Sequence, residues 1–388
     1  MSLPLHLRAQ NIGVAPGLYK VLGVAEALQQ QFPLSRVLID TRHGPEVELA
    51  ALASFGIAGV VSATREEGDV PQLYALSVEE ALAAGDAIRV QPSGQINVLY
   101  RRGANANSLF VTERCNSLCL MCSQPPRQVD DGWRAEELMD LLPLIDSTLD
   151  VLGVTGGEPT ILGPLLQKLL AGARHHLPAT HIHVLTNGRL FAEPTFVDAF
   201  KGVRGHVTWA VPLYADVARV HDEIVQAPSA FAETMNGLHN LAERGHLVEI
   251  RTVLHALSLP RITKWADFVH RNLPFARHVA LMGLEPMGLA RGNASLLEND
   301  PSLLSAKIAP AVGLLHQAGM NVSIYNIPLC ALQPGLWPYA RKSISDWKNE
   351  YASACASCAI QQDCCGFFRS APASFRDMVA RPLPLRAA

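Results

Sequence analysis

The stretch NSLFVTERCNSLCLMC, residues 107–122, decides the fold. Its first half has the apolar character of a buried strand, and its second half places Cys115, Cys119 and Cys122 on one short loop with C-x3-C-x2-C spacing. Three thiolates on such a loop can bind three irons of a cubane and leave the fourth iron open. Structural zinc takes four closed ligands, so three cysteines favour a catalytic cluster. A zinc site or a chance spacing is the alternative.

A second stretch, VLGVTGGEP at residues 151–159, predicts a strand that ends in Gly156, Gly157 and Glu158. Two glycines let a ligand approach the backbone closely. The adjacent carboxylate can accept hydrogen bonds from a ligand ammonium group. A glycine pair after a strand is more often only a turn. The order of strand, cysteine loop, helix, strand and glycine–glutamate turn favours a shared site.

Residues 107–320 alternate strand-like and helical segments in six units. Such alternation predicts a parallel sheet, and the largely apolar strands indicate that both of its faces are covered. Six units can curl into an incomplete barrel, in which chemistry lies at the carboxyl ends of the strands. The predicted fold is therefore α/β, a partial (β/α)6 TIM-like barrel.

The segments on either side of this barrel have a different character. Residues 1–80 mix helical and strand-like pieces without catalytic motifs, which predicts a small α/β accessory or peptide-docking domain. Residues 81–106 read as a β-hairpin that leads into the barrel. Residues 321–388 are rich in Pro, Trp, Cys and Ser and show little periodicity. A segment of this kind needs an external staple such as a bound metal.

Composition narrows the classes of function. The 388 residues are 49% hydrophobic and 17% charged with a net charge of −3, which describes a folded chain without the basic excess typical of nucleic-acid binding. We find neither a signal peptide nor an apolar run of membrane-spanning length. We therefore expect a soluble, cytoplasmic protein with no nucleic-acid or membrane partner. Clustered cysteines in that compartment indicate metal binding or catalysis before disulfides.

The C-terminal segment holds the other five of the eight cysteines. The predicted ligands are Cys330, Cys355, Cys358 and Cys364. Four thiolates fit a closed [4Fe–4S] cluster or structural zinc, and their spacing does not separate the two. Cys365 directly follows Cys364, and either could be the fourth ligand.

The order and spacing of the motifs in residues 107–293 resemble the radical S-adenosylmethionine (SAM) superfamily. The resemblance implies a [4Fe–4S] cluster on Cys115, Cys119 and Cys122 whose open iron chelates the amino and carboxylate groups of S-adenosylmethionine. It implies that the glycine–glycine–glutamate turn binds the same amino group. Met121 occupies the apolar or aromatic position that precedes the last cysteine in this family.

Four further positions follow from the same resemblance. Thr186 and Asn187 end the third predicted strand and would line the ligand, although an ordinary Asn-Gly turn is an equal alternative. Arg251 lies on the fifth strand, where an inward arginine needs a carboxylate partner. In this family that partner can be the S-adenosylmethionine carboxylate, and the alternative is an outward ion pair. Gly283 on the sixth strand would offer backbone groups to adenine.

Three phrases resemble one narrower family, the radical SAM maturase termed the C component of the His-Xaa-Ser peptide system. They are YRRGANANSLFVTERCNSLCLMCSQPPR (100–127), GLEPMGLARGN (283–293) and LWPYARKSISDWKNEY (336–351). The resemblance implies a ribosomally made precursor peptide as substrate, a companion radical maturase and an external electron donor of flavodoxin or ferredoxin type. It also favours an auxiliary [4Fe–4S] cluster over zinc in the C-terminal segment.

Two other functions stay open. The chain could be a radical SAM enzyme that acts on a small molecule or on tRNA. The net charge of −3 disfavours tRNA as the substrate. It could also be a non-catalytic zinc or iron–sulfur scaffold within a maturation complex. A scaffold would have no use for an open iron or for the glycine–glutamate turn.

Overall fold

The computed structural model describes residues 3–29, 33–43, 49–342 and 349–383. The chain forms two compact units whose boundaries do not follow the sequence. The first comprises Met1–Leu109, Ala135–Leu152 and Gly172–Thr180, and the second comprises Phe110–Arg134, Gly153–Ala171 and His181–Ala388. None of the helices within the described ranges has the length and apolarity that a membrane span requires.

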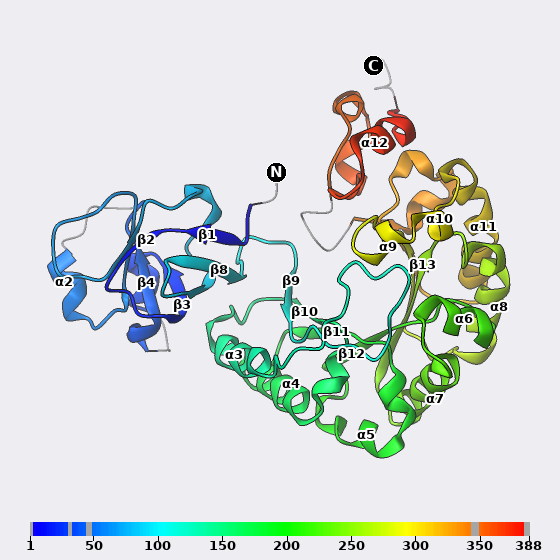
Figure 1. Ribbon diagram of the computed structural model, residues 1–388, viewed down its shortest axis with the longest axis horizontal. Coiled ribbons are helices and arrows are strands. Elements are labelled where there is room, and N and C mark those ends of the chain that lie inside the picture. The colour runs from blue at the N-terminus through cyan, green and yellow to red at the C-terminus, as the bar shows by residue number, and fades with distance from the viewer. Residues whose placement is uncertain (1–2, 30–32, 44–48, 343–348, 384–388) are drawn as a thin grey trace. The chain divides into compact units, whose positions relative to one another are not determined.

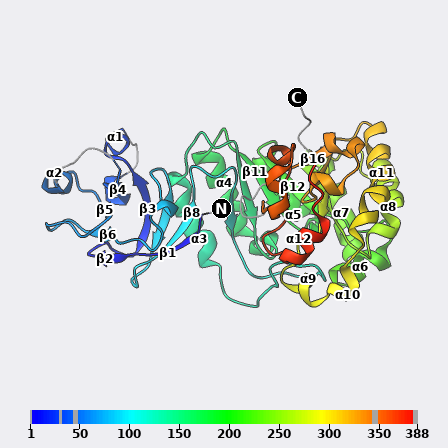
Figure 2. The ribbon, with the colours of Figure 1, turned by 90° about the horizontal axis from the view of Figure 1, so that it is seen from above.

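The first unit contains an eight-stranded sheet in the order β1-β8-β7-β3-β4-β5-β6-β2, in which β3 to β6 are visible in Figure 2. The strands are β1 (His6–Arg8), β2 (Gln10–Ile12), β3 (Gly17–Leu22), β4 (Val37–Asp40), β5 (Gly59–Ser62), β6 (Gln72–Tyr74), β7 (Ala87–Val90) and β8 (Gln95–Tyr100). Two short helices, α1 (Val24–Ala27) and α2 (Leu49–Ser54), accompany them.

One bent strand closes this sheet. β1 and β2 stand at opposite ends of the strand order, yet only Ala9 separates them in sequence. β1 pairs with β8 and β2 pairs with β6, so the two halves of the bent strand cover both edges. This pairing covers the edges of β8 and β6, which are then not available for pairing with another chain.

The hairpin β7–β8 corrects the domain boundary expected at residue 80. β7 pairs antiparallel with β3 in the middle of the sheet, so residues 81–106 belong to the N-terminal fold and do not form a separate lead-in. The central strands are buried on both faces. Successive residues of a strand point to opposite faces of the sheet. Val21 and Leu22 of β3 accordingly belong to two different apolar clusters, one on each face.

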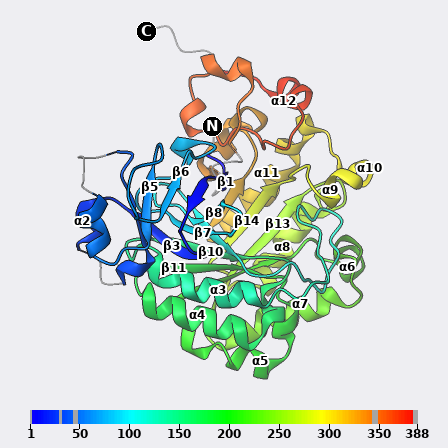
Figure 3. The ribbon, with the colours of Figure 1, turned by 60° about the vertical axis from the view of Figure 1, so that its left-hand side comes forward.

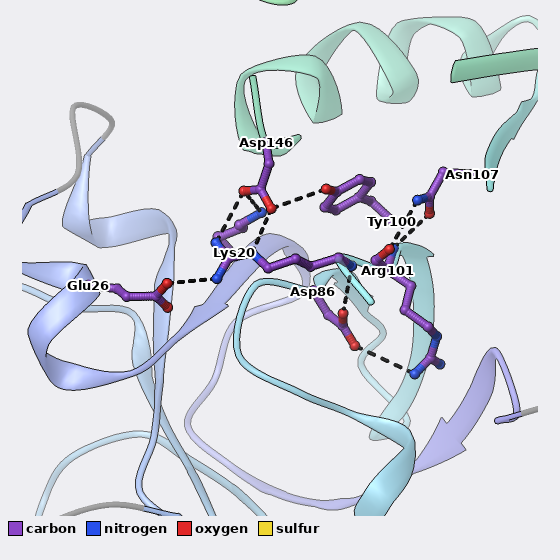
Figure 4. Close-up of polar contacts among 8 residues, drawn as sticks. Lys20, Glu26, Asp86, Tyr100, Arg101, Asn107 and Asp146 are labelled. Carbon is purple, nitrogen blue, oxygen red and sulfur yellow. Dashed lines mark hydrogen bonds and ion pairs between the residues drawn. The ribbon is translucent and has the colours of Figure 1, made fainter. Parts of the chain in front are cut away.

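A buried ionic network joins this sheet to the segment after helix α3 (Trp133–Leu141) (Figure 4). Lys20 is 1% exposed, and its Nζ lies 2.8 Å from Asp146 Oδ1 and 4.8 Å from the centre of the Tyr100 ring. Arg102 Nε donates to Asp146 Oδ2 at 2.6 Å, and Tyr100 Oη donates to the same oxygen at 3.1 Å. Asp146 therefore neutralises a lysine that has no access to water.

The second sheet has the order β16-β15-β14-β13-β12-β11-β10-β9, and its strands from β11 to β16 pair in parallel (Figure 1). The strands are β9 (Asn107–Phe110), β10 (Val151–Thr155), β11 (His181–Leu185), β12 (Val207–Pro212), β13 (Leu247–Leu254), β14 (His278–Gly283), β15 (Val322–Tyr325) and β16 (Ala340–Arg341). The six predicted strands are confirmed as β9 to β14, and the curled sheet is a partial barrel. It continues through β15 and β16, beyond the boundary expected at residue 320.

Helices cover the outer face of this sheet (Figure 3). The helices in this part of the chain are α4 (Pro164–His176), α5 (Pro194–Asp198), α6 (Ala218–Val225), α7 (Ala230–Glu243), α8 (Ile262–Asn272), α9 (Leu289–Gly292), α10 (Ala294–Leu297) and α11 (Pro301–Gln317), with α12 (Ala373–Val379) near the C-terminus. Of these, α6 and α9 also contact the loop of residues 115–122. On β12, Trp209 is fully buried against Phe191 and Phe200 on the helix side. Because successive residues of a strand point to opposite faces, Ala210 and Pro212 of β12 face the barrel interior, and so do their register partners Glu249 and Arg251 of β13.

We expect Asp146→Asn to lower the free energy of unfolding of the N-terminal unit by about 3–5 kcal/mol, because it removes the carboxylate that pairs directly with buried Lys20. Urea denaturation measures the change. Asp267→Asn on α8 is the matched control, since its ion pair with Arg271 is exposed and should contribute little. Equal stability of the two variants would contradict the role assigned to the network.

Candidate active site

The loop of residues 115–122 is held by hydrogen bonds along its second half. The amides of Leu118 and Leu120 donate to carbonyls in the last turn of α6, at 3.0 and 2.9 Å. The carbonyls of Leu120 and Cys122 accept from Asn293 Nδ2 and from the first amide of α9, at 2.9 and 2.8 Å. Elements far apart in sequence therefore determine where the three cysteines lie.

The three thiols of this loop lie close enough to influence one another. Burial raises the pKa of Cys119 to about 12, and the neighbouring Cys115 and Cys122 add to the shift. Burial also raises the pKa of Cys115 to about 11, with Glu158 and Cys122 as further causes. Thiols that resist ionisation alone become stable thiolates when cationic iron binds, so this donor set fits a cluster.

Within the described ranges, no three His, Cys, Asp or Glu side chains are placed to hold a single metal ion. A cubane differs from such a site, because each cysteine binds its own iron.

Asp131, which the sequence analysis missed, anchors the exit of β9. Its side chain is 2% exposed and accepts from Thr112 Oγ1 at 2.9 Å and from the Glu113 amide at 2.6 Å. Arg114 and Arg134 form ion pairs with it at 3.4 and 3.8 Å. This carboxylate holds the three residues that lead into Cys115, which is a positioning role.

The glycine pair packs against that same backbone. A Cβ on Gly156 would meet the carbonyl oxygen of Thr112, and one on Gly157 would meet that of Arg114. The Gly157 and Glu158 amides donate to these two carbonyls, each at 2.7 Å. The glycines thus allow the end of β10 to reach the backbone before the first cysteine. Their predicted contact with a ligand stays a prediction.

Glu158 joins the end of β10 to the end of β11. It is 1% exposed and accepts from the Thr160 amide and hydroxyl at 2.9 and 2.5 Å, from Thr186 Oγ1 at 2.6 Å and from the Asn187 amide at 2.6 Å. Burial raises its pKa, while these hydrogen bonds act in the opposite direction. Oε1 takes three of the four donors, so Oε2 keeps one acceptor position. The structure thus brings together Glu158, Thr186 and Asn187.

The end of β11 also contacts the cysteine loop. Asn187 Nδ2 donates to Asn116 Oδ1 at 2.6 Å. Arg189 Nη1 donates to the Asn116 carbonyl, and at 3.1 Å to Ser117 Oγ. Gly188 has φ +76°, so the expected Asn-Gly turn is present as well. Asn187 and Gly188 therefore form the turn, and Asn187 also contacts the cysteine loop.

Arg251 on β13 faces the barrel interior and pairs with a carboxylate of the protein, and its contact with S-adenosylmethionine stays a prediction. Its Nη1 lies 3.3 Å from Glu249 Oε1, and its Nη2 donates to Met282 Sδ at 3.0 Å. His278 Nδ1 and His183 Nε2 lie 2.8 and 3.3 Å from Glu249 Oε2. Burial alone would raise the pKa of Glu249, but these histidines and Arg251 hold it well below its usual range.

Tyr214, also missed from the sequence, lies two residues beyond β12. Burial raises the pKa of its hydroxyl well above the usual value, and the charges of Cys119, Cys122 and Arg251 act on it. Its ring stacks on His221 with centroids 5.8 Å apart and planes at 27°, and its amide donates to His221 Nδ1 at 3.2 Å. Tyr214 thus occupies the space between the cysteine loop and β13.

Two predicted cofactor residues have clear packing roles. Met121 is 7% exposed and lies in an apolar cluster with Tyr214 and Leu284, which lines the site on the side of Cys119. A Cβ on Gly283 would meet the carbonyl of Asn326, so this glycine allows the ends of β14 and β15 to approach. Contacts of either residue with S-adenosylmethionine stay predictions.

The structure also brings together the predicted ligands of the C-terminal segment. Cys330 lies in a short helix, Leu329–Ala331, and Cys355 in another, Ser353–Ser357. The charges of Cys364 and Cys355 raise the pKa of Cys330 beyond the effect of its burial, and Cys358 acts on Cys355 in the same way. These four thiols therefore form one group.

Cys364 is the most strongly hydrogen-bonded sulfur of this group. The amides of Leu329 and Gly366 each donate to its Sγ at 3.3 Å. A hydrogen bond from the Cys365 thiol, together with these amides, lowers the pKa of Cys364 to about 6. Tyr351 Oη donates to the Cys364 carbonyl at 2.8 Å. The surroundings of Cys364 thus stabilise a thiolate.

Comparison with known proteins assigns the barrel. The family model of the radical SAM superfamily matches residues 109–290. This part of the chain is a radical SAM domain. Such a domain uses a [4Fe–4S] cluster and S-adenosylmethionine, and the cysteine-rich C-terminal segment fits an auxiliary cluster. No curated protein matches the chain.

Three solved structures are similar to parts of this chain at low identity. SuiB from Streptococcus suis bound to S-adenosylmethionine is 15% identical, with a TM-score of 0.46 over 56% of this chain and 49% of that one. SuiB bound to the precursor peptide SuiA is 14% identical, with a TM-score of 0.45 over 58% and 49%. A radical SAM methyltransferase from Sphaerobacter thermophilus is 16% identical, with a TM-score of 0.43 over 62% and 72%. The matched region spans about half the length of SuiB.

We expect Asp131→Asn to lower stability by about 1–3 kcal/mol, because its new amide group would face donors at the exit of β9. The loosened loop should also retain less iron after reconstitution, measured as iron per chain before and after treatment with a chelator. Asp130→Asn is the matched control, because this neighbour is exposed. Iron retention equal to that control would refute the positioning role of Asp131.

Proposed function

We propose that this chain is a radical SAM enzyme that modifies a ribosomally made precursor peptide of the His-Xaa-Ser type. The observation that carries the proposal is the presence of two separate thiol groups in one unit. One lies at the strand ends beside Arg251, and the other lies in the C-terminal segment. The peptide substrate is supported by the three phrases that resemble the His-Xaa-Ser maturase, of which the first contains the barrel cysteines and the third lies between Cys330 and Cys355.

At the barrel site, Cys115, Cys119 and Cys122 would hold the cluster. When bound, the reduced cluster and S-adenosylmethionine supply methionine and a 5′-deoxyadenosyl radical, which takes a hydrogen atom from a substrate carbon. Arg251 would pair with the ligand carboxylate, and this role is supported by the fact that Glu249 and Met282 occupy only part of its five donors. Tyr214, Met121 and Leu284 exclude water, which protects reactive intermediates.

In the C-terminal segment, Cys330, Cys355, Cys358 and Cys364 would hold an auxiliary [4Fe–4S] cluster in preference to zinc. The amide bonds to Cys364 support its place in this set, since such hydrogen bonds are typical of cluster ligands. The apolar core of this segment, around Phe367 and Cys355, is small. A core of this size does not stabilise a fold by itself, so a bound metal cluster would contribute the remaining stability.

The proposal includes three partners and a compartment. The substrate would be the precursor peptide, and a flavodoxin or ferredoxin would supply electrons. A companion radical maturase would act on the same peptide. Cysteines that bind iron must stay reduced, so we expect the protein to work in the reducing cytoplasm.

The test begins with anaerobic reconstitution, followed by iron and sulfide counts and an assay with dithionite and S-adenosylmethionine. We expect about eight irons per chain and formation of 5′-deoxyadenosine. Cys119→Ala should hold about four irons and form no 5′-deoxyadenosine. Leu118→Ala, whose side chain is exposed in the same loop, should behave as the parent.

A synthetic peptide with His-Xaa-Ser repeats then tests the substrate class by mass spectrometry. A peptide mass change that requires S-adenosylmethionine supports the proposal. Formation of 5′-deoxyadenosine without any change in the peptide would keep the radical reaction and reject this substrate. Zinc alone, with no cleavage of S-adenosylmethionine, would favour the scaffold function.

We expect Arg251→Ala to raise the dissociation constant of S-adenosylmethionine by about 10–100-fold, because a hydrogen bond to a charged group contributes about 1.5–3 kcal/mol. Equilibrium dialysis against reconstituted protein measures this constant. Arg271→Ala serves as the control, because Arg271 is exposed on α8. An unchanged dissociation constant, with full iron content, would remove Arg251 from the ligand site.

A further inference from the structure

The first half of the cysteine loop is held by a side chain that follows the end of β11. Arg189 Nη1 donates to the Asn116 carbonyl and, at 3.1 Å, to Ser117 Oγ. Both acceptors lie on the short run between Cys115 and Cys119, whereas α6 and α9 hold the second half of the loop. The guanidinium therefore lies against the backbone that joins the first two cysteines.

The same guanidinium is anchored on helix α7. Its Nε donates to Glu233 Oε2 at 2.6 Å. Helix α7 packs closely on the turn before Arg189, because a Cβ on Gly237 would meet the Gly188 carbonyl. Arg189 thus connects a fixed helix to the loop with two nitrogens of one planar group. A lysine could not do the same, since it has a single charged nitrogen on a flexible stem.

Arg189 also brings a positive charge to the loop. Its side chain is 13% exposed, whereas that of its partner Glu233 is 40% exposed, so water screens the negative charge more than the positive one. Burial raises the pKa of Cys119 to about 12, and the charge of Arg189 acts against this rise. A reduced cluster has one more negative charge than an oxidised one. A fixed positive charge nearby therefore stabilises the reduced form.

We propose that Arg189 is a positioning residue that holds the first half of the cysteine loop and, through its charge, raises the reduction potential of the barrel cluster. The inference deepens the proposed function, because it rests on the cluster proposed for Cys115, Cys119 and Cys122. A higher potential favours the reduced cluster, so an external electron donor would reduce it more readily.

The experiment uses the full reconstituted chain as parent and compares it with Arg189→Gln, Arg189→Lys and Glu233→Gln. The electron paramagnetic resonance signal of the barrel cluster is the one that is missing from Cys119→Ala. Its potential is measured by a redox titration without S-adenosylmethionine, and iron is counted before and after treatment with a chelator. Neither readout depends on enzyme activity. Arg271→Gln, in the exposed ion pair on α8, is the matched control.

We expect Arg189→Gln to lose iron to the chelator faster than the parent and to show a more negative potential. At a fixed applied potential its ratio of oxidised to reduced barrel cluster should rise several-fold, where tenfold corresponds to about 59 mV for one electron. Arg189→Lys keeps the charge without the fork, so its potential should stay nearer the parent's although iron is lost faster. Glu233→Gln keeps an oxygen acceptor and removes the opposing charge, so its potential should become more positive. Arg271→Gln should behave as the parent.

Several results would overturn the inference. A potential and an iron retention equal to the parent's in Arg189→Gln would remove both roles of Arg189. Equal potentials in Arg189→Gln and Arg189→Lys would show that the charge is not the cause. Shifts of the same sign in Arg189→Gln and Glu233→Gln would indicate a structural disturbance instead. A parent without a signal that depends on Cys119 would reject the proposed barrel cluster itself, and this failure is distinguishable because it precedes any change at Arg189.

Discussion

The close contact between the end of β10 and the backbone at Thr112 and Arg114 determines where the first cysteine lies. Gly156 and Gly157 permit this contact because any side chain there would meet a carbonyl oxygen. The two amide hydrogen bonds then fix the backbone just before Cys115. The same contact places the Glu158 carboxylate next to the end of β11, while α6 and α9 hold the rest of the cysteine loop. The glycine pair, which the sequence suggested as a ligand-binding turn, is therefore needed first of all for close packing of the backbone.

Buried carboxylates organise the rest of the site. Asp131 holds the exit of β9, Glu158 joins β10 to β11, and Glu249 holds Arg251 inside the barrel. Each is nearly excluded from water, so each is stable only with its full set of donors. Such groups hold the surrounding elements rigidly, as pre-organised binding requires. The site therefore depends on polar residues that need not touch a ligand.

The two cysteine groups differ in how their sulfurs are prepared for iron. In the barrel loop, burial and mutual repulsion keep the thiols protonated until metal arrives. In the C-terminal segment, Cys364 already receives two amide hydrogen bonds. Amide donors of this kind influence the electron density on a bound cluster. The two sites therefore suit different tasks: the first suits a cluster with an open iron, and the second suits a cluster held closed by the protein.

The sequence by itself determined the features that depend on local spacing: the C-x3-C-x2-C loop, the glycine–glutamate turn and six strands in order. Cysteine spacing and strand periodicity are properties of neighbouring residues, so they can be read without a fold. Tertiary structure alone decided the partners, because contacts such as Asp131 with Thr112 or Glu249 with His278 join separate segments. For the same reason only the folded sheet showed that β7 and β8 belong to the N-terminal unit. The spacing of Cys364 and Cys365 left open which of them is the ligand, and only the fold showed that Cys364 Sγ accepts from the amides of Leu329 and Gly366 while Cys365 Sγ donates to the Gly366 carbonyl.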